Sequence, residues 1–332
     1  MNNKLYGKIK KYIIDNHNFL LFLVAFTLVL NIKVPYVIKR PGGIISLNDR
    51  VTIDGKKMKN NFYTSYVSVS EGRVVTYVAS LVMPRWDLEK LSSFSSGEDL
   101  SYKEISNIQK ISMDNSNNLA IKLVYDRLNI PYEEINNGLY VYYSDPEYKN
   151  DFKPQDKILK CQNNQVLTHD DLSSCINSND KLEIVVKRGK KDVTIKPKIY
   201  NLDGKKILGI VVFNDVKLKS EKNVVINDKE NEQGSSGGLM TTLAIYDALS
   251  DSKLSKGRKI AGTGTIEEDG KVGEIAGVKY KLLGADKQNV DVFFVPRYNY
   301  LEAKNVKKKY HLKLKLVVVD TLDDAINYLK GN

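Results

Sequence analysis

The stretch Gly234-Ser235-Ser236-Gly237-Gly238 determines how the C-terminal part of this 332-residue chain is interpreted. The short apolar run 223–226 precedes it and predicts a strand. Apolar residues recur at helical spacing after it, which predicts an amphipathic helix over 238–249. One of the serines therefore stands at the first turn of a helix, where backbone N–H groups have no internal partner and the dipole is positive. Such groups can stabilise an oxyanion, although a serine at this position is also a common helix cap.

Lys281 follows on a second predicted helix, over 277–287. The residues one turn away from it are glycine, valine and alanine, whose side chains cannot pair with an ammonium. Burial would therefore favour the neutral amine and lower the lysine pKa, and a neutral amine can accept a serine proton near pH 7. The alternative is an ordinary surface lysine. Lys279 also has apolar neighbours, so the local spacing does not choose between the two lysines.

Histidine usage favours a lysine base. His17, His169 and His311 lack a local signature such as Gly-x-Ser-x-Gly, although a Ser-His-Asp triad is recognised by geometry and stays open. Cys161 and Cys175 are 14 positions apart and could form a disulfide in an oxidising compartment. The sequence has no metal-ligand spacing and no Gly-x-x-x-x-Gly-Lys-[Ser/Thr] loop, so we expect no cofactor, no metal and no ATP.

Three motifs, the serine turn among them, carry a family resemblance. They are GSSGGLM at 234–240, RKIAGTGTI at 258–266 and DGKVGEIAGVKYK at 269–281. In this order they resemble the proteolytic domain of Lon-type serine proteases. More closely, the chain resembles the membrane-anchored, PDZ-containing Lon-like peptidases of Gram-positive bacteria.

The resemblance implies a role for each matching residue. Ser236 matches the nucleophile, Lys281 the general base, and Thr263 a threonine that holds the lysine in place. The supporting turn consists of Gly234, Ser235 and Gly237. Ser235 stands where the family has proline, and Gly237 where it has alanine. The first of these differences leaves open which serine attacks, and Ser236 is the one we expect.

Alternating strands and helices continue through the predicted proteolytic domain, 205–330. The Asp-Gly pair within 266–272 predicts a hairpin, and 290–296 and 316–319 predict buried strands. A closing helix is expected over 322–329. This order implies an α/β or α+β layer structure, and the resemblance favours an α+β fold with mixed sheets and packed helices.

An apolar run marks the N-terminal part of the chain. No charged residue occurs over 16–32, and lysines precede this run. The pattern predicts a cytoplasmic N-terminus over 1–18 and a transmembrane anchor over 19–38, with the rest of the chain outside the cytoplasm. A cleaved signal peptide is the alternative, but no small-x-small cleavage site follows the run.

Residues 130–200 resemble a PDZ domain. The stretch Gly138-Leu139-Tyr140-Val141 opens a strand that is predicted to bind peptide, and 152–159 resembles the loop and strand that follow in such domains. A groove helix is expected over 170–176, and a hairpin over 182–195. PDZ domains add a peptide as an extra strand, which here would present substrate to the serine. The alternative is a structural β-rich spacer.

The region 44–128 predicts strands over 62–69 and 74–82 and an amphipathic helix over 118–128. Lon-type proteolytic domains begin with strands and then a helix. We therefore expect this region to pack on the C-terminal domain, with the PDZ-like module inserted between them.

Charge and motifs together narrow the expected partners. The formal net charge is +11, from 51 Lys and Arg against 40 Asp and Glu, and it is spread along the chain without a nucleic-acid-binding motif. We therefore expect membrane and peptide or protein partners, and no nucleic acid. The expected function is an ATP-independent serine endopeptidase that cleaves extracytoplasmic peptides or exposed protein segments. The alternative is a catalytically inactive, membrane-tethered PDZ adaptor, and a homo-oligomer stays possible because Lon-type domains often form rings.

Overall fold

The computed structural model describes residues 2–94 and 100–331, with side chains from residue 5 onward. Residue 1 of the predicted N-terminal segment and 95–99 of the predicted region 44–128 lie outside the described residues. The chain divides into two compact units. The first comprises Met1–Arg40 and Ser68–Gly97, and the second comprises Pro41–Val67 and Glu98–Asn332.

The first unit begins with helices α1 (Asn2–Asp15) and α2 (His17–Leu30). Among the described residues, no single helix has the length and apolar composition to cross a membrane. On those two criteria, only the pair Leu5–Asp15 and His17–Leu30, bent by 75°, could do so. The predicted anchor over 19–38 needs a correction, because α2 ends at Leu30 and strand β1 (Lys33–Ser46) follows. Residues 36–39 of β1 pair with strand β5 (Asp87–Lys90), which holds them in extended conformation.

The predicted strand over 74–82 is wrong, because helix α3 (Val74–Val82) occupies these residues. It follows strand β4 (Phe62–Arg73), which confirms the strand predicted over 62–69. The Arg73 N–H donates to Thr76 Oγ1, and this hydroxyl donates to the Arg73 carbonyl, so the first helical turn is closed locally. Valines also recur every four residues in this run, so its pattern fits a helix as well as a strand. A short helix, α4 (Leu91–Phe94), ends the described part of this unit.

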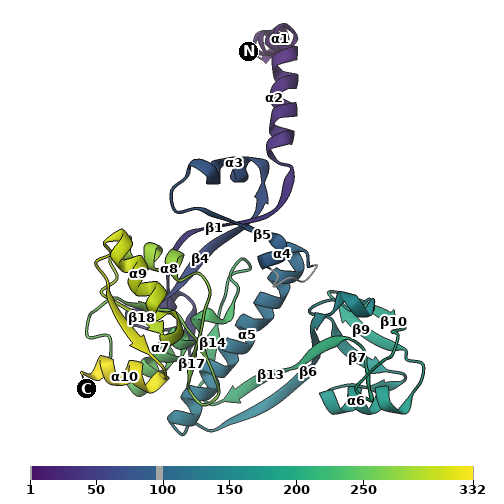
Figure 1. Cartoon of the computed structure of the whole chain (residues 1–332), viewed down its shortest axis with the longest axis vertical. Coiled ribbons are helices and arrows are strands. Elements are labelled where there is room, and N and C mark those ends of the chain that lie inside the picture. Colours follow the sequence, from purple (N-terminus) through teal and green to yellow (C-terminus); the bar gives the residue numbers. More distant parts are fainter. Residues whose placement is uncertain (1, 95–99, 332) are drawn as a thin grey trace. The chain divides into compact units, whose positions relative to one another are not determined.

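A mixed sheet organises the second unit (Figure 1). Strands β19, β18, β15 and β4 are parallel neighbours in that order, and β1 lies beyond β4. Parallel strands need cover on both faces, which explains why β18 is wholly buried. The strands of this part are β2 (Val51–Ile53), β3 (Lys56–Lys57), β14 (Val224–Ile226), β15 (Ile260–Gly262), β16 (Thr265–Ile266), β17 (Val272–Gly273), β18 (Val292–Pro296) and β19 (Lys315–Val319). The helices are α5 (Tyr102–Arg127), α7 (Gly238–Ser250), α8 (Val278–Asp286), α9 (Tyr300–Tyr310) and α10 (Leu322–Lys330).

These elements confirm most of the C-terminal prediction. The predicted helices over 238–249, 277–287 and 322–329 correspond to α7, α8 and α10. The Asp-Gly hairpin joins β16 and β17, which pair antiparallel. The strands predicted over 290–296 and 316–319 are β18 and β19.

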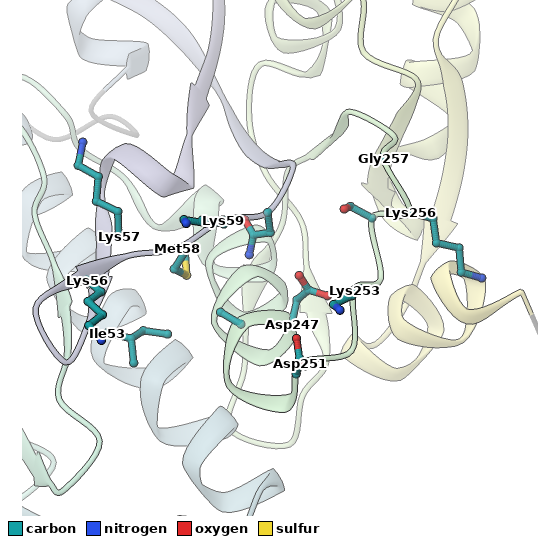
Figure 2. A pocket seen from close by; sticks show the side chains of 13 residues that line it. Ile53, Lys56, Lys57, Met58, Lys59, Asp247, Asp251, Lys253, Lys256 and Gly257 are labelled. Atoms are coloured by element: carbon teal, nitrogen blue, oxygen red, sulfur yellow. The ribbon is translucent and has the colours of Figure 1, made fainter.

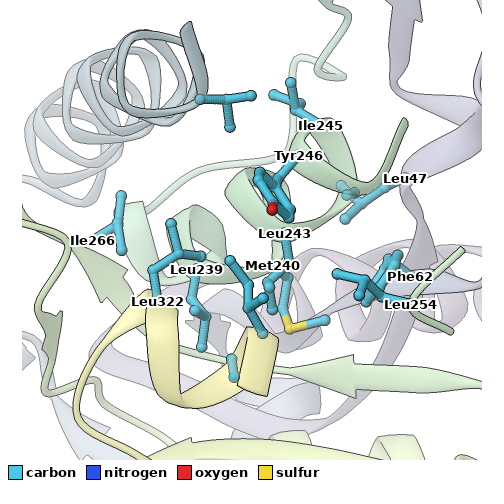
Figure 3. Packing of buried hydrophobic residues seen from close by; sticks show 14 of the residues in the cluster. Leu47, Phe62, Leu239, Met240, Leu243, Ile245, Tyr246, Leu254, Ile266 and Leu322 are labelled. Atoms are coloured by element: carbon cyan, nitrogen blue, oxygen red, sulfur yellow. The ribbon is translucent and has the colours of Figure 1, made fainter. Parts of the chain in front are cut away.

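One apolar core joins segments that are far apart in the sequence. Leu47 and Phe62 belong to the same buried cluster as Leu239 and Leu243 of α7, and Figure 3 shows these side chains together. Ile121, Val124 and Tyr125 of α5 belong to this cluster as well. Burial of one such side chain contributes roughly 1.5–3 kcal/mol. These parts of 44–128 therefore pack on the C-terminal elements, as expected, whereas 68–97 belongs to the first unit.

The predicted PDZ-like region has its own sheet and its own apolar core. The helix predicted over 170–176 corresponds to α6 (His169–Ser178), and the predicted hairpin is formed by β9 (Ile184–Arg188) and β10 (Lys191–Ile195). The remaining strands are β6 (Tyr132–Ser144), β7 (Lys157–Cys161), β8 (Asn164–Gln165), β11 (Tyr200–Leu202), β12 (Lys205–Ile207) and β13 (Ile210–Ser220). A disulfide between Cys161 and Cys175 joins β7 to α6. Because β13 belongs to this sheet, the module extends past the boundary predicted near residue 200.

Candidate active site

A glycine-rich turn carries Ser236 into helix α7. Residues 235–237 form a single 3₁₀ turn, and Gly234 before it has φ of 94°, a conformation that other residues adopt only with strain. A Cβ on Gly237 would lie 2.9 Å from Thr64 Oγ1, and one on Gly238 would lie 2.6 Å from Ser116 Oγ. The glycines therefore let this turn approach strand β4 and helix α5 closely.

The structure places Lys281 against Ser236. The Lys281 Nζ is 2.7 Å from the Ser236 Oγ and 2.8 Å from the Thr263 Oγ1. Lys281 is only 3% exposed, and burial lowers its pKa from 10.5 to about 7. A group with a pKa near 7 is about half neutral at pH 7, so the amine is able to accept a proton.

The geometry distinguishes the two serines and the two lysines that the sequence leaves open. Of the two serines, Ser236 is the one that bonds the lysine amine. Of the two lysines, Lys281 is buried, whereas Lys279 is only partly buried and its ammonium lies 5.2 Å from the centre of the Tyr280 ring. The backbone of α8 approaches β1 so closely that a Cβ on Gly284 would lie 2.7 Å from the Gly42 carbonyl carbon. Seven of the nine residues of α8 are buried, Lys281 among them, so its side chain is desolvated.

Thr263 fixes the orientation of the amine. Its buried hydroxyl donates to the Ser236 carbonyl oxygen at 3.1 Å, which uses its only proton. Toward Lys281 the Thr263 oxygen can therefore only accept. When the amine is neutral, one N–H points to Thr263 and the lone pair is left for the Ser236 hydroxyl. Thr263, which the family resemblance places near the lysine, is therefore within hydrogen-bond distance of the Lys281 amine.

The start of the turn supplies free N–H groups. The Ser235 carbonyl accepts bonds from the Gly238 N–H and the Ser116 hydroxyl, and the Ser236 carbonyl accepts one from the Gly264 N–H at 2.8 Å. Within residues 2–94 and 100–331, the N–H groups of Ser235 and Ser236 donate no hydrogen bond. Such groups at the positive end of a helix can bind an oxyanion.

Helix α5 supports the turn from the other side, and sequence reasoning missed this contribution. The Gly234 N–H donates to the Gln109 carbonyl at 2.9 Å, and the Ser106 hydroxyl donates to Gln233 Oε1 at 2.5 Å. The Ser116 hydroxyl donates to the Ser235 carbonyl at 3.2 Å. These residues lie more than a hundred positions before the serine. The amphipathic pattern over 118–128 predicts only the last part of α5, and the capping box at Ser101 and Glu104 marks its start.

The histidines lie elsewhere. The His169 Nδ1 is 3.4 Å from the Ser173 hydroxyl in α6, and His17 bonds the Ile14 carbonyl in the first unit. His311 caps the end of α9 and is exposed. None of the hydrogen bonds described for the chain joins a histidine to Ser236, so the described geometry contains a Ser-Lys pair and no Ser-His pair.

A separate cavity of about 660 Å³ lies at the other end of α7. Figure 2 shows Lys56 and Lys59, from the segment after β2, on one side and Asp247 and Asp251, from the end of α7, on the other. With a rise of 1.5 Å per residue, Asp247 is roughly 14 Å along the helix from its start. The cavity therefore takes no part in the site around Ser236.

The predicted peptide-binding stretch of the module has both of its edges paired. On one side, Val141, Tyr140 and Gly138 of β6 face residues 212–215 of β13. On the other side, Leu139 and Tyr140 face residues 157–158 of β7. A peptide could add as a strand at 138–141 only if β13 left this edge. Peptide binding by these four residues stays a prediction.

Comparisons with known proteins point to the same part of the chain. Residues 225–330 match the family described as the Lon protease (S16) C-terminal proteolytic domain. The Lon protease of Campylobacter jejuni is 29% identical over 136 residues, which cover 36% of this chain and 17% of the relative. The Lon protease of Campylobacter concisus is 33% identical over 96 residues, and that of Malacoplasma penetrans is 34% identical over 98 residues. The latter two matches cover 29% and 30% of this chain and 12% of each relative.

The chain thus spans less than a fifth of the length of these three relatives. The match includes the serine turn, the strand that leads to Thr263 and the helix that carries Lys281. Residues 225–330 therefore carry a Lon-type proteolytic domain.

Proposed function

We propose that this protein is an ATP-independent serine endopeptidase with a Ser-Lys dyad, tethered to a membrane and cleaving peptides or exposed protein segments outside the cytoplasm. The observation that carries the proposal is the 2.7 Å contact between the buried Lys281 amine and the Ser236 hydroxyl. The Lon-type domain supports a serine protease. Without a nucleotide loop in the sequence, substrates must be short, flexible or already exposed.

The proposed reaction follows from the positions of these groups. Neutral Lys281 takes the Ser236 proton while the oxygen attacks the peptide carbonyl. The N–H groups of Ser235 and Ser236 stabilise the oxyanion. The protonated lysine then gives its proton to the leaving amine. In the second half of the reaction the same lysine takes a proton from a water molecule that attacks the acyl carbonyl, and it returns this proton to the Ser236 oxygen as the acyl group leaves as a carboxylic acid. Thr263 holds the amine in line throughout.

Two features support the proposed compartment. The Cys161–Cys175 disulfide fits an oxidising environment outside the cytoplasm. The bent helix pair before β1 supplies the apolar segment for the tether, with lysines in the preceding helix as expected for its cytoplasmic side. The retained Ser-Lys-Thr arrangement favours the peptidase over an inactive PDZ adaptor.

The test is cleavage of a panel of unstructured peptides by the full chain in detergent or vesicles, without ATP. We expect cleavage by the parent protein and by Ser235→Ala, and none by Ser236→Ala. Equal cleavage by the parent and by Ser236→Ala would refute the assignment. If Ser235→Ala alone abolished turnover, Ser235 would be the nucleophile.

A further inference from the structure

Helix α3 presents an apolar surface in the first unit. No charged residue occurs from Val74 to Met83, and no residue of α3 is buried. The side chains of Leu81 and Val82 are 66% and 76% exposed, and Val78 is exposed as well. A helix of a globular unit normally turns such side chains to a core. Because these side chains are exposed in α3, we infer that another apolar surface covers them.

The start of α3 is bonded to the end of α2. The Val74 N–H donates to the Ile32 carbonyl at 3.0 Å, and the Arg73 guanidinium donates to the Asn31 side-chain oxygen at 2.8 Å. Figure 1 shows α3 beside the end of α2 at which β1 begins. No residue of α2 is buried either. The apolar surface of α3 therefore begins where that of α2 ends.

Aromatic and cationic side chains lie in α3 and in the segments next to it. The rings of Tyr36 and Tyr77 are 5.4 Å apart, and the Arg40 guanidinium lies 5.2 Å from the centre of the Trp86 ring. Lys33 is exposed and pairs with Glu71 at 2.8 Å. Tyrosine, tryptophan, lysine and arginine at the limit of an apolar surface are typical of the headgroup layer of a membrane.

We propose that α3 lies in the interfacial layer of a phospholipid bilayer, with Val78, Leu81 and Val82 at the acyl boundary, as a second lipid contact beside α2. This inference rests on the membrane tether of the proposed function. A short amphipathic helix next to a spanning segment binds at this depth through its apolar face. A second copy of the chain is a poorer occupant, because a stable protein interface buries about 800 Å² on each partner and α3 has only nine residues.

The test places a tryptophan on α3 of the full chain. Leu81→Trp is made together with Trp86→Phe, so that the new residue is the only tryptophan. The protein is incorporated into vesicles of phosphatidylcholine and phosphatidylglycerol, with and without bromine on the acyl chains. A matched control carries Tyr298→Trp, an exposed position in the second unit, in the same background. We expect brominated lipid to remove at least half of the emission at 81 and to leave that at 298 unchanged. Adding Val82→Asp should lower the quenching at 81 at least twofold.

The possible outcomes distinguish a failure of the α3–lipid contact from a failure of the membrane tether. Flotation with the vesicles reports whether the tether holds. Flotation with an unquenched tryptophan at 81 would overturn the α3 contact alone. A blue-shifted but unquenched emission would show that protein covers α3, which also overturns it. Failure to float would overturn the tether and the α3 contact together.

Discussion

Two regions of the molecule are predicted to bind peptide, and they differ in whether the binding groups are already in place and accessible. The site at the start of α7 is assembled: the hydroxyl, the amine and the threonine are already within hydrogen-bond distance. The edge of β6 in the module is occupied, because β13 pairs along it. The difference shows that a glycine-rich turn and an apolar helix can be predicted from local pattern. Whether a strand edge is open depends instead on whether a distant segment, here β13, pairs with it. The comparison predicts that changes in the site abolish cleavage and that changes in the module only adjust it.

The strongest way to break the comparison is Ser236→Ala. Removal of the nucleophile should lower kcat/KM by about 10³-fold or more, because no other hydroxyl bonds the Lys281 amine at an attacking position. The measurement is peptide cleavage by the full chain. Ser235→Ala is the matched control and should stay within about tenfold of the parent, since its hydroxyl makes no bond to the lysine.

Lys281→Arg should be nearly as damaging, with a loss of about 10³-fold, because arginine keeps its proton and cannot act as a base. In the parent protein the pH profile should show the same requirement. The neutral amine is the active form and the pKa is about 7, so kcat/KM should rise through pH 7 and fall about tenfold per pH unit below pH 6. A rate that stays flat from pH 5 to 8 would exclude this base.

The buried amine should also lower the stability of the second unit. The folded pKa is about 7 and the unfolded value is 10.5, so between these values the unfolded chain binds more protons and stability increases as the pH rises. Lys281→Met removes this penalty and should raise the free energy of unfolding at pH 7 by up to about 4 kcal/mol, with a smaller gain at pH 10. Urea unfolding in detergent at both pH values measures the difference. A gain that does not depend on pH would contradict it.

Thr263→Val should lower kcat by about 10- to 100-fold and leave KM nearly unchanged, because the amine loses the acceptor that orients it while the substrate contacts stay. Thr263→Ser keeps the hydroxyl and should recover most of the activity. The pH profile provides a second readout, since a change in the position of the lysine should shift its apparent pKa. Equal rates for the valine and serine variants would exclude an orienting role.

The smallest effect is expected in the module. Ile210 and Val212 of β13 pack against its core, so Ile210→Ser with Val212→Thr should loosen the strand at the β6 edge. We expect binding of hydrophobic C-terminal peptides to tighten by about tenfold or less, and cleavage of short peptides to stay within about twofold. Titration calorimetry measures the first quantity. Tight binding by the parent module would show that β13 does not close this edge.

Local sequence signals located the serine turn and the lysine helix but not their surroundings. They left two serines and two lysines as candidates, and the family resemblance singled out Ser236 and Lys281, because a turn and a helix face are set by nearby residues whereas burial is set by the rest of the fold. The helix at 74–82 was predicted as a strand because its valines fit both periods, and the Thr76 bond that closes its first turn is a detail of side-chain geometry. The support from Ser116 and Gln109 was not predictable, since it depends on α5 packing beside a turn that comes more than a hundred positions later.

The insertion point of the module has a consequence for how such a chain can be rebuilt. Tyr132 at the start of β6 faces Ser220 at the end of β13, and the Ser220 hydroxyl donates to the Pro131 carbonyl at 2.8 Å. The chain therefore leaves and re-enters the rest of the second unit at almost the same place. A tight turn could bridge that gap, and a foreign domain with adjacent termini could replace the native one. We therefore expect the module to be exchangeable for other domains at this insertion site, with no change in the core packing around Ser236.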